Sequence, residues 1–157
     1  MNATSVELEL PATSSPGATI GFKVVGRLHS AVGWPNFAVG FAYVDGPAPE
    51  VTLSYYYAGE KRTFKLRRGE VVYGYLSPPA ISSITVAYDV EGLGPGRYAF
   101  AGLAGYVEGG VFYYDSRIDK ALTVVGVAPS LLPIAVLGLA LATALVVAIY
   151  LARRRAR

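Results

Sequence analysis

Alternation of apolar and polar residues runs through the first 126 positions of this chain and predicts a series of short β-strands. In residues 6–10 and 20–28, apolar side chains occupy every second position. A period of two is expected of a half-buried strand, because successive side chains point to opposite faces of a sheet. Similar segments follow at residues 37–43, 51–57, 63–67, 71–75, 84–90, 97–106, 112–114 and 122–125.

Turn-forming residues separate these segments. Pro, Gly, Asn and Asp gather at residues 33–36, 45–49 and 92–96, and residues 11–17 form a further turn-rich break. Short strands divided by turns every 8–12 residues, without a helical period, are typical of a β-sandwich. We therefore predict an all-β head at residues 1–126, a β-sandwich of about eight strands. Within residues 37–43, one face carries only Ala38, Gly40 and Ala42, which predicts close approach of another layer or of a neighbouring chain.

Residues 93–98, Leu-Gly-Pro-Gly-Arg-Tyr, resemble the Leu-x-Pro-Gly…Tyr signature of immunoglobulin-like and fibronectin type III sandwiches. In those folds a tyrosine locks the corner before the penultimate strand, and Tyr98 matches it. The spacing is one residue shorter than in the usual fibronectin form, and there is no cysteine pair or core tryptophan of the antibody type. The resemblance spans about fifteen residues and implies an Ig-like sandwich, with adhesion or scaffolding only by analogy of fold.

A long uncharged segment, residues 131–151, follows the head. As a helix it would be roughly 31 Å long, close to the ~30 Å hydrocarbon thickness of a bilayer. We predict one C-terminal transmembrane α-helix at residues 127–152 and a basic cytoplasmic tail at residues 153–157. The residues assigned to this anchor are Leu131, Pro133, Gly138, Ala142, Tyr150, Arg153, Arg154, Arg155 and Arg157.

The arginines predict the orientation, because basic residues that flank a span stay preferentially on the cytoplasmic side. The head is then outside the cell membrane and the C-terminus is cytoplasmic. Residues 1–10 show no leader peptide. Either a leader has been removed or replaced by Met1, or the head is exported without one, or the protein is tail-anchored with a cytosolic head. The span with its basic end resembles the sorting signals of archaeal surface proteins. Gly138 and Ala142 lie four positions apart, which favours association with a second helix.

The amino-acid composition excludes several classes of partner and site. The head holds ten Lys and Arg against eleven Asp and Glu, so the net charge of +3 comes from the tail and predicts no nucleic-acid partner. The absence of cysteine excludes disulfides, thiolate metal sites and a cysteine nucleophile. The chain has no Gln, two Asn, and ten Arg against four Lys, which we interpret as the composition of a thermophilic, archaeal protein.

Catalytic residues are not recognisable. His29 is the only histidine, and no nucleophile motif accompanies it. The pairs Asp115/Asp119 and Asp89/Glu91 lack the spacing of a calcium loop. We predict no enzyme activity, no cofactor and no metal, although a spatial carboxylate pair of the glycosidase type is invisible to sequence reasoning.

Aromatic and basic residues are the remaining candidates for binding. Adjacent tyrosines at 55–57 and 113–114 face opposite sides of a strand, so Tyr56 and Tyr113 are candidates for exposed contacts. Lys65 and Arg67 share the outer face of a basic hairpin, where charge also guards a sheet edge. Asn2 begins a glycosylation sequon.

We therefore expect a membrane-anchored module with a structural or protein-interaction role in the cell envelope, or an accessory subunit of a membrane complex. Its partners are the membrane and another protein, or a second copy bound through helix or head. The alternatives are a carbohydrate-binding or carbohydrate-cleaving surface domain and a self-assembling surface filament subunit.

Overall fold

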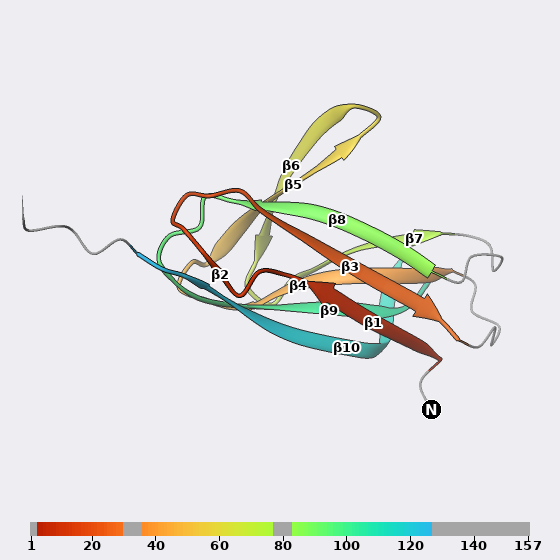
Figure 1. Ribbon diagram of the computed structural model, residues 1–157. Helices are drawn as coiled ribbons and strands as arrows, with labels where there is room; N and C mark the ends of the chain where they lie inside the picture. The colour runs from red at the N-terminus through yellow and green to blue at the C-terminus, as the bar shows by residue number, and fades with distance from the viewer. Residues whose placement is uncertain (1–2, 30–35, 77–82, 127–157) are drawn as a thin grey trace, which may run out of the picture. The chain divides into compact units, whose positions relative to one another are not determined.

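The computed structural model describes residues 3–29, 36–76 and 83–126, all within a compact unit that spans Met1–Gly126. Every described element is a strand (Figure 1). The strands are β1 (Thr4–Glu9), β2 (Thr13–Ser14), β3 (Ile20–Leu28), β4 (Phe37–Asp45), β5 (Glu50–Tyr57), β6 (Glu60–Arg67), β7 (Val71–Leu76), β8 (Ser83–Glu91), β9 (Gly96–Glu108) and β10 (Val111–Val124).

These strands form two five-stranded sheets. The first has the order β1-β3-β8-β5-β6 and the second the order β2-β10-β9-β4-β7. All pairs are antiparallel except β2 with β10. The runs β1-β3-β8-β5 and β10-β9-β4 reproduce the ABED and GFC sheets of an immunoglobulin sandwich, and β6 and β7 each extend one sheet. The predicted Ig-like β-sandwich is therefore confirmed.

The core lies between the sheets, where aromatic rings from both layers meet. Phe22 of β3 stacks on Phe41 of β4 with ring centroids 3.9 Å apart, and Phe41 stacks on Phe100 of β9 at 5.2 Å. Leu8, Leu53 and Leu122 fill the space around them and are buried. The predicted alternation thus places its apolar side chains inside the sandwich.

A tyrosine corner closes one end of the sandwich. The hydroxyl of Tyr98, a residue only 1% exposed, donates a hydrogen bond to the carbonyl oxygen of Gly94 over 3.0 Å. This is the contact that the resemblance implies, because the corner tyrosine of such folds bonds to backbone a few residues upstream. A second tyrosine makes a similar bond next to this corner: the Tyr43 hydroxyl donates a hydrogen bond to the carbonyl oxygen of Ala48 over 2.6 Å.

The strand boundaries differ from the prediction in two places. The break at residues 11–17 contains β2, which pairs with the end of β10. Residues 112–114 and 122–125 belong mostly to one long strand, β10, with a register shift between Tyr114 and Ser116. Gly105 of β9 makes this shift possible, because a Cβ atom there would lie 1.9 Å from the Tyr113 carbonyl oxygen. The described part of the chain has ten strands, whereas a sandwich of about eight was predicted.

The described residues contain no helix that is long and apolar enough to cross a membrane. The predicted span at residues 127–152, with all its assigned anchor residues, lies outside the described residues, as do the tail at 153–157 and Asn2. These assignments therefore stay predictions.

Candidate functional site

The β5–β6 hairpin leaves the first sheet halfway along its length. β5 pairs with β8 only from Thr52 to Ser54, whereas its ladder with β6 continues to Tyr57. Ala58 and Gly59 form the tip with φ values of 52° and 81°, which a two-residue hairpin turn requires. Figure 1 shows the outer half of this hairpin standing away from the sandwich. Both sides of its outer half are therefore available for contact.

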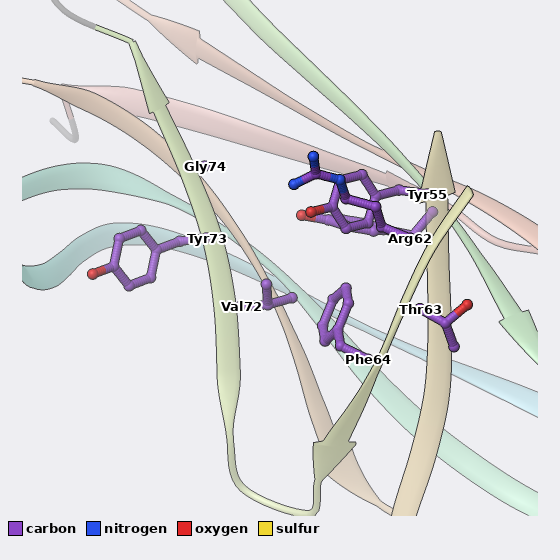
Figure 2. A pocket seen from close by; sticks show the side chains of 8 residues that line it. Tyr55, Arg62, Thr63, Phe64, Val72, Tyr73 and Gly74 are labelled. Carbon is purple, nitrogen blue, oxygen red and sulfur yellow. The ribbon is translucent and has the colours of Figure 1, made fainter. Parts of the chain in front are cut away.

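A cleft of about 720 Å³ lies between this hairpin and β7 (Figure 2). Its volume falls within the range of small-ligand sites, roughly 300–1,000 Å³. The lining residues are Tyr55, Arg62, Thr63 and Phe64 of the hairpin, Val72, Tyr73 and Gly74 of β7, and Tyr88 of β8. The cleft opens where β6 and β7 are the last strands of different sheets.

One wall of the cleft is aromatic. Tyr55, Phe64 and Tyr88 meet edge to face, with ring centroids 5.9–6.1 Å apart. Burial, and to a lesser degree the neighbouring Tyr55, raises the pKa of Tyr88 above its usual value. The Tyr88 hydroxyl is therefore neutral at physiological pH and can donate a hydrogen bond.

Arg62 is the cation of the cleft. Its guanidinium carbon lies 4.9 Å from the centroid of the Tyr57 ring, a cation–π distance. Among the described residues, Arg62 forms no ion pair with a carboxylate, in contrast to Lys61, which pairs with Glu91. Arg62 lies opposite Tyr55 in the β5–β6 ladder, and both residues line the cleft. An acidic ligand group would therefore meet a cation without an acidic partner.

The cleft continues along the two strands. A second cavity of about 510 Å³ shares Phe64, Val72 and Tyr73 with the first and reaches Glu70 beside the β6–β7 turn. We call the two cavities together the β6–β7 groove.

The basic residues singled out from the sequence lie on this hairpin. Lys65 lines the second cavity, and its ammonium group donates to the Glu50 carboxylate over 2.7 Å. Arg67 is exposed, and its backbone N–H donates to the Glu70 carboxylate over 2.9 Å. Lys61 pairs with Glu91; its hydrogen bond lowers the pKa of that carboxyl, and Ser54 adds a second bond.

The exposed tyrosines occupy separate places. Tyr56 lies near the hairpin tip and is 69% exposed. Tyr113 lies on β10, where its ring stacks on Tyr106 at 5.2 Å. The structure does not bring these two candidates into one site, and it adds Tyr55 and Tyr88 to the cleft instead.

An apolar face covers the outside of the second sheet at β7 and the start of β10, while Arg117 and Asp119 lie on the same side further along β10. Register places Val71, Tyr73 and Tyr75 of β7 on the same side as Phe112 and Tyr114 of β10. The Phe112 and Tyr73 rings stack at 5.3 Å, and a Cβ atom at Gly40 would lie 2.7 Å from Phe112. The small residues of β4 are thus covered by aromatic side chains of their own sheet. We call the five residues Val71, Tyr73, Tyr75, Phe112 and Tyr114 the aromatic face.

The remaining polar candidates have structural partners. Asp115, at the β10 register shift, accepts hydrogen bonds from the backbone N–H of Ala3 over 2.8 Å and from Thr4. His29 is hydrogen-bonded to Ser5 at 2.7 Å on the surface. No group of three or more potential metal ligands occurs among the described residues.

No protein-family model matches this chain, and no curated protein does. Solved structures with a similar chain path include a conjugative transposon lipoprotein from Bacteroides eggerthii, at 9% identity and a TM-score of 0.48, covering 76% of this chain and 96% of that one. The CARDB domain of the PF1109 protein from Pyrococcus furiosus, solved with di-metal ions, has 11% identity and a TM-score of 0.41, covering 79% and 96%. At these values no function carries over to this chain.

Proposed function

We propose that the protein is a membrane-anchored, extracytoplasmic β-sandwich module that binds another protein in the cell envelope, as a structural element or as an accessory subunit of a membrane complex. The observation that carries the interaction role is the aromatic face. Tyr75 and Tyr114 are 53% and 50% exposed there, on a floor of small and apolar side chains. Aromatic residues around an apolar centre are enriched at protein interfaces.

The anchor supports the location. Residues 131–151 carry no charge and four arginines follow, a pattern that favours a single span with the head outside. A tethered head searches only the envelope surface, which raises its effective concentration near other membrane proteins. An exposed aromatic face is then useful, because even a weak interface becomes occupied.

Site-specific photocrosslinking in cells tests the interaction. A benzophenone amino acid replaces Tyr75 on the aromatic face or, as the matched control, Lys23 on the outer side of the first sheet. We expect one defined crosslinked product from position 75 and none from position 23. The same unspecific mixture of crosslinked products from both positions, or no product from either, would contradict a protein-binding role of the aromatic face. An open ladder of crosslinked copies of this chain would favour the filament alternative.

A carbohydrate-binding role is the second candidate, because the aromatic wall of the cleft offers rings on which a sugar could stack. None of the residues that line the 720 Å³ cleft is a carboxylate, so cleavage by a carboxylate pair has no support there. If this role holds, a surface polysaccharide binds the full-length chain and Tyr55→Ala weakens that binding. Equal retention of the wild type and Tyr55→Ala on polysaccharide beads would exclude it.

A further inference from the structure

The β6–β7 groove is bordered by two strand edges that no other described strand covers. β6 is the last strand of the first sheet, and β7 is the last strand of the second. The turn at Arg68–Glu70 joins them, and Figure 2 shows the strands meeting at this turn and separating above it. Each edge presents backbone N–H and C=O groups that an added strand can satisfy.

The shape of the groove fits an extended chain better than a compact ligand. Its two cavities share Phe64, Val72 and Tyr73 in their linings, and the second adds Leu66 and Glu70 toward the β6–β7 turn. β7 has 6 residues, which corresponds to about 20 Å of extended chain. Gly74 lines the first cavity, and a Cβ atom there would have no neighbour within 4 Å among the described residues. A segment of about six residues therefore matches the groove.

The two edges differ in chemistry. β6 carries Lys61, Arg62, Lys65 and Arg67, and charges of this kind protect an edge against pairing. β7 reads Val-Val-Tyr-Gly-Tyr-Leu and has neither charge nor proline. An added strand would therefore pair with β7, and every second one of its side chains would point into the groove.

The basic residues of β6 favour an acidic residue in the added strand. Residues 60–70 hold five basic and two acidic residues, while the head as a whole is close to neutral. Lys61 and Lys65 already pair with Glu91 and Glu50, whereas Arg62 forms no ion pair among the described residues. The lining residues Phe64 and Val72 would contact apolar side chains of an added strand, and Arg62 would pair with a carboxylate.

We propose that the β6–β7 groove binds an extended segment of a partner protein as an added β-strand on β7, with apolar side chains in the groove and an acidic residue beside Arg62. This inference rests on the proposed function, because it names the kind of segment that an interacting protein presents. It places the contact on the groove side of β7, while the aromatic face lies on the other side of the same strand.

Peptide binding to the full-length chain in lipid nanodiscs tests the proposal. The probe is a fluorescent octapeptide of alternating Val and Thr that ends in two Glu residues. One matched peptide ends in two Lys residues, and another carries N-methyl groups on alternate amides. We expect the Glu peptide to bind about tenfold more tightly than the Lys peptide, with less binding at high salt. The N-methylated peptide lacks the ladder donors and should not bind.

Two protein variants locate the site. Gly74→Leu places a side chain in the lining of the first cavity. Gly94→Leu is its matched control, because a Cβ atom there also meets nothing within 4 Å and the residue is exposed. We expect Gly74→Leu to weaken the Glu peptide at least about tenfold and Gly94→Leu to leave it unchanged. Arg62→Glu should reverse the preference between the Glu and Lys peptides. Circular dichroism confirms that each variant is folded.

Three results would overturn the inference: equal binding by wild type and folded Gly74→Leu, equal binding of the N-methylated peptide, or displacement of the peptide by a neutral polysaccharide. Absence of peptide binding together with a defined crosslink from position 75 would end the strand proposal and leave the proposed function standing. Absence of both peptide binding and the crosslink from position 75 would contradict the strand proposal and the proposed function together.

Discussion

Removal of the Tyr98 hydroxyl is the sharpest test of the fold. Tyr98→Phe keeps the ring, which packs 6.2 Å from Tyr43 and 6.4 Å from Phe100, and deletes only the 3.0 Å hydrogen bond to Gly94. A typical hydrogen bond contributes about 0.5–1.5 kcal/mol, and a buried acceptor left without a partner costs about 1–3 kcal/mol. Gly94 is exposed, so water can replace the hydroxyl in part. The expected loss is therefore about 1–2 kcal/mol of unfolding free energy.

Thermal unfolding followed by near-ultraviolet circular dichroism measures this loss. For a domain of this size, 1 kcal/mol corresponds to a change in Tm of about 3–6 °C. Tyr56→Phe is the matched control, because Tyr56 is largely exposed and its hydroxyl has no partner to lose among the described hydrogen bonds. Equal Tm values for Tyr98→Phe and Tyr56→Phe would refute the corner.

Two further predictions concern single contacts of the head, and a third concerns the predicted membrane helix. Gly105→Ala should destabilise the head by about 1–3 kcal/mol in urea unfolding, because the new Cβ atom would collide with the backbone of Tyr113. Gly74→Ala should be nearly neutral, because its Cβ atom meets nothing within 4 Å. Similar urea midpoints for the two variants would contradict the close approach of β9 and β10 at Gly105. The Lys61 hydrogen bond lowers the pKa of Glu91, so the ion pair stabilises the fold above about pH 4.5 and this stabilisation is lost as the pH falls below that value. Glu91→Gln should therefore reduce Tm at pH 7 more than at pH 3. An equal reduction at both pH values would exclude a stabilising ion pair. Replacing Gly138 and Ala142 with Leu should abolish helix pairing measured by crosslinking in membranes, and unchanged pairing would make the helix an anchor only.

Local patterns predicted the parts of the fold that depend on local chemistry. Alternation located most strands, and residues 93–98 predicted the Tyr98 corner, because the bond to Gly94 spans only four positions. The β6–β7 groove was not predicted. Arg68–Glu70 has the composition of a hairpin turn, and alternation does not tell whether consecutive strands pair or belong to different sheets.

Long-range contacts explain the other differences. Asp115 supports the start of β1 through the backbone of Ala3, 112 positions away, and no local signal marks such a pair. The small residues of β4 predicted close approach of another layer or of a neighbouring chain, whereas the group that closely approaches Gly40 is the Phe112 ring of the same sheet. The length of β10 was hidden because its middle, residues 115–121, is mostly polar and exposed or half-buried at the sheet surface.

Protease protection tests the central claim, a membrane-anchored module whose head is outside the cell. Protease added to intact cells should remove the head and leave a small protected fragment that contains residues 131–157. Neutral replacements of Arg153, Arg154, Arg155 and Arg157 should produce a mixture of orientations, because these arginines are the main charge asymmetry across the span. A head that stays intact until the membrane is broken would contradict the claim and favour the tail-anchored, cytosolic arrangement.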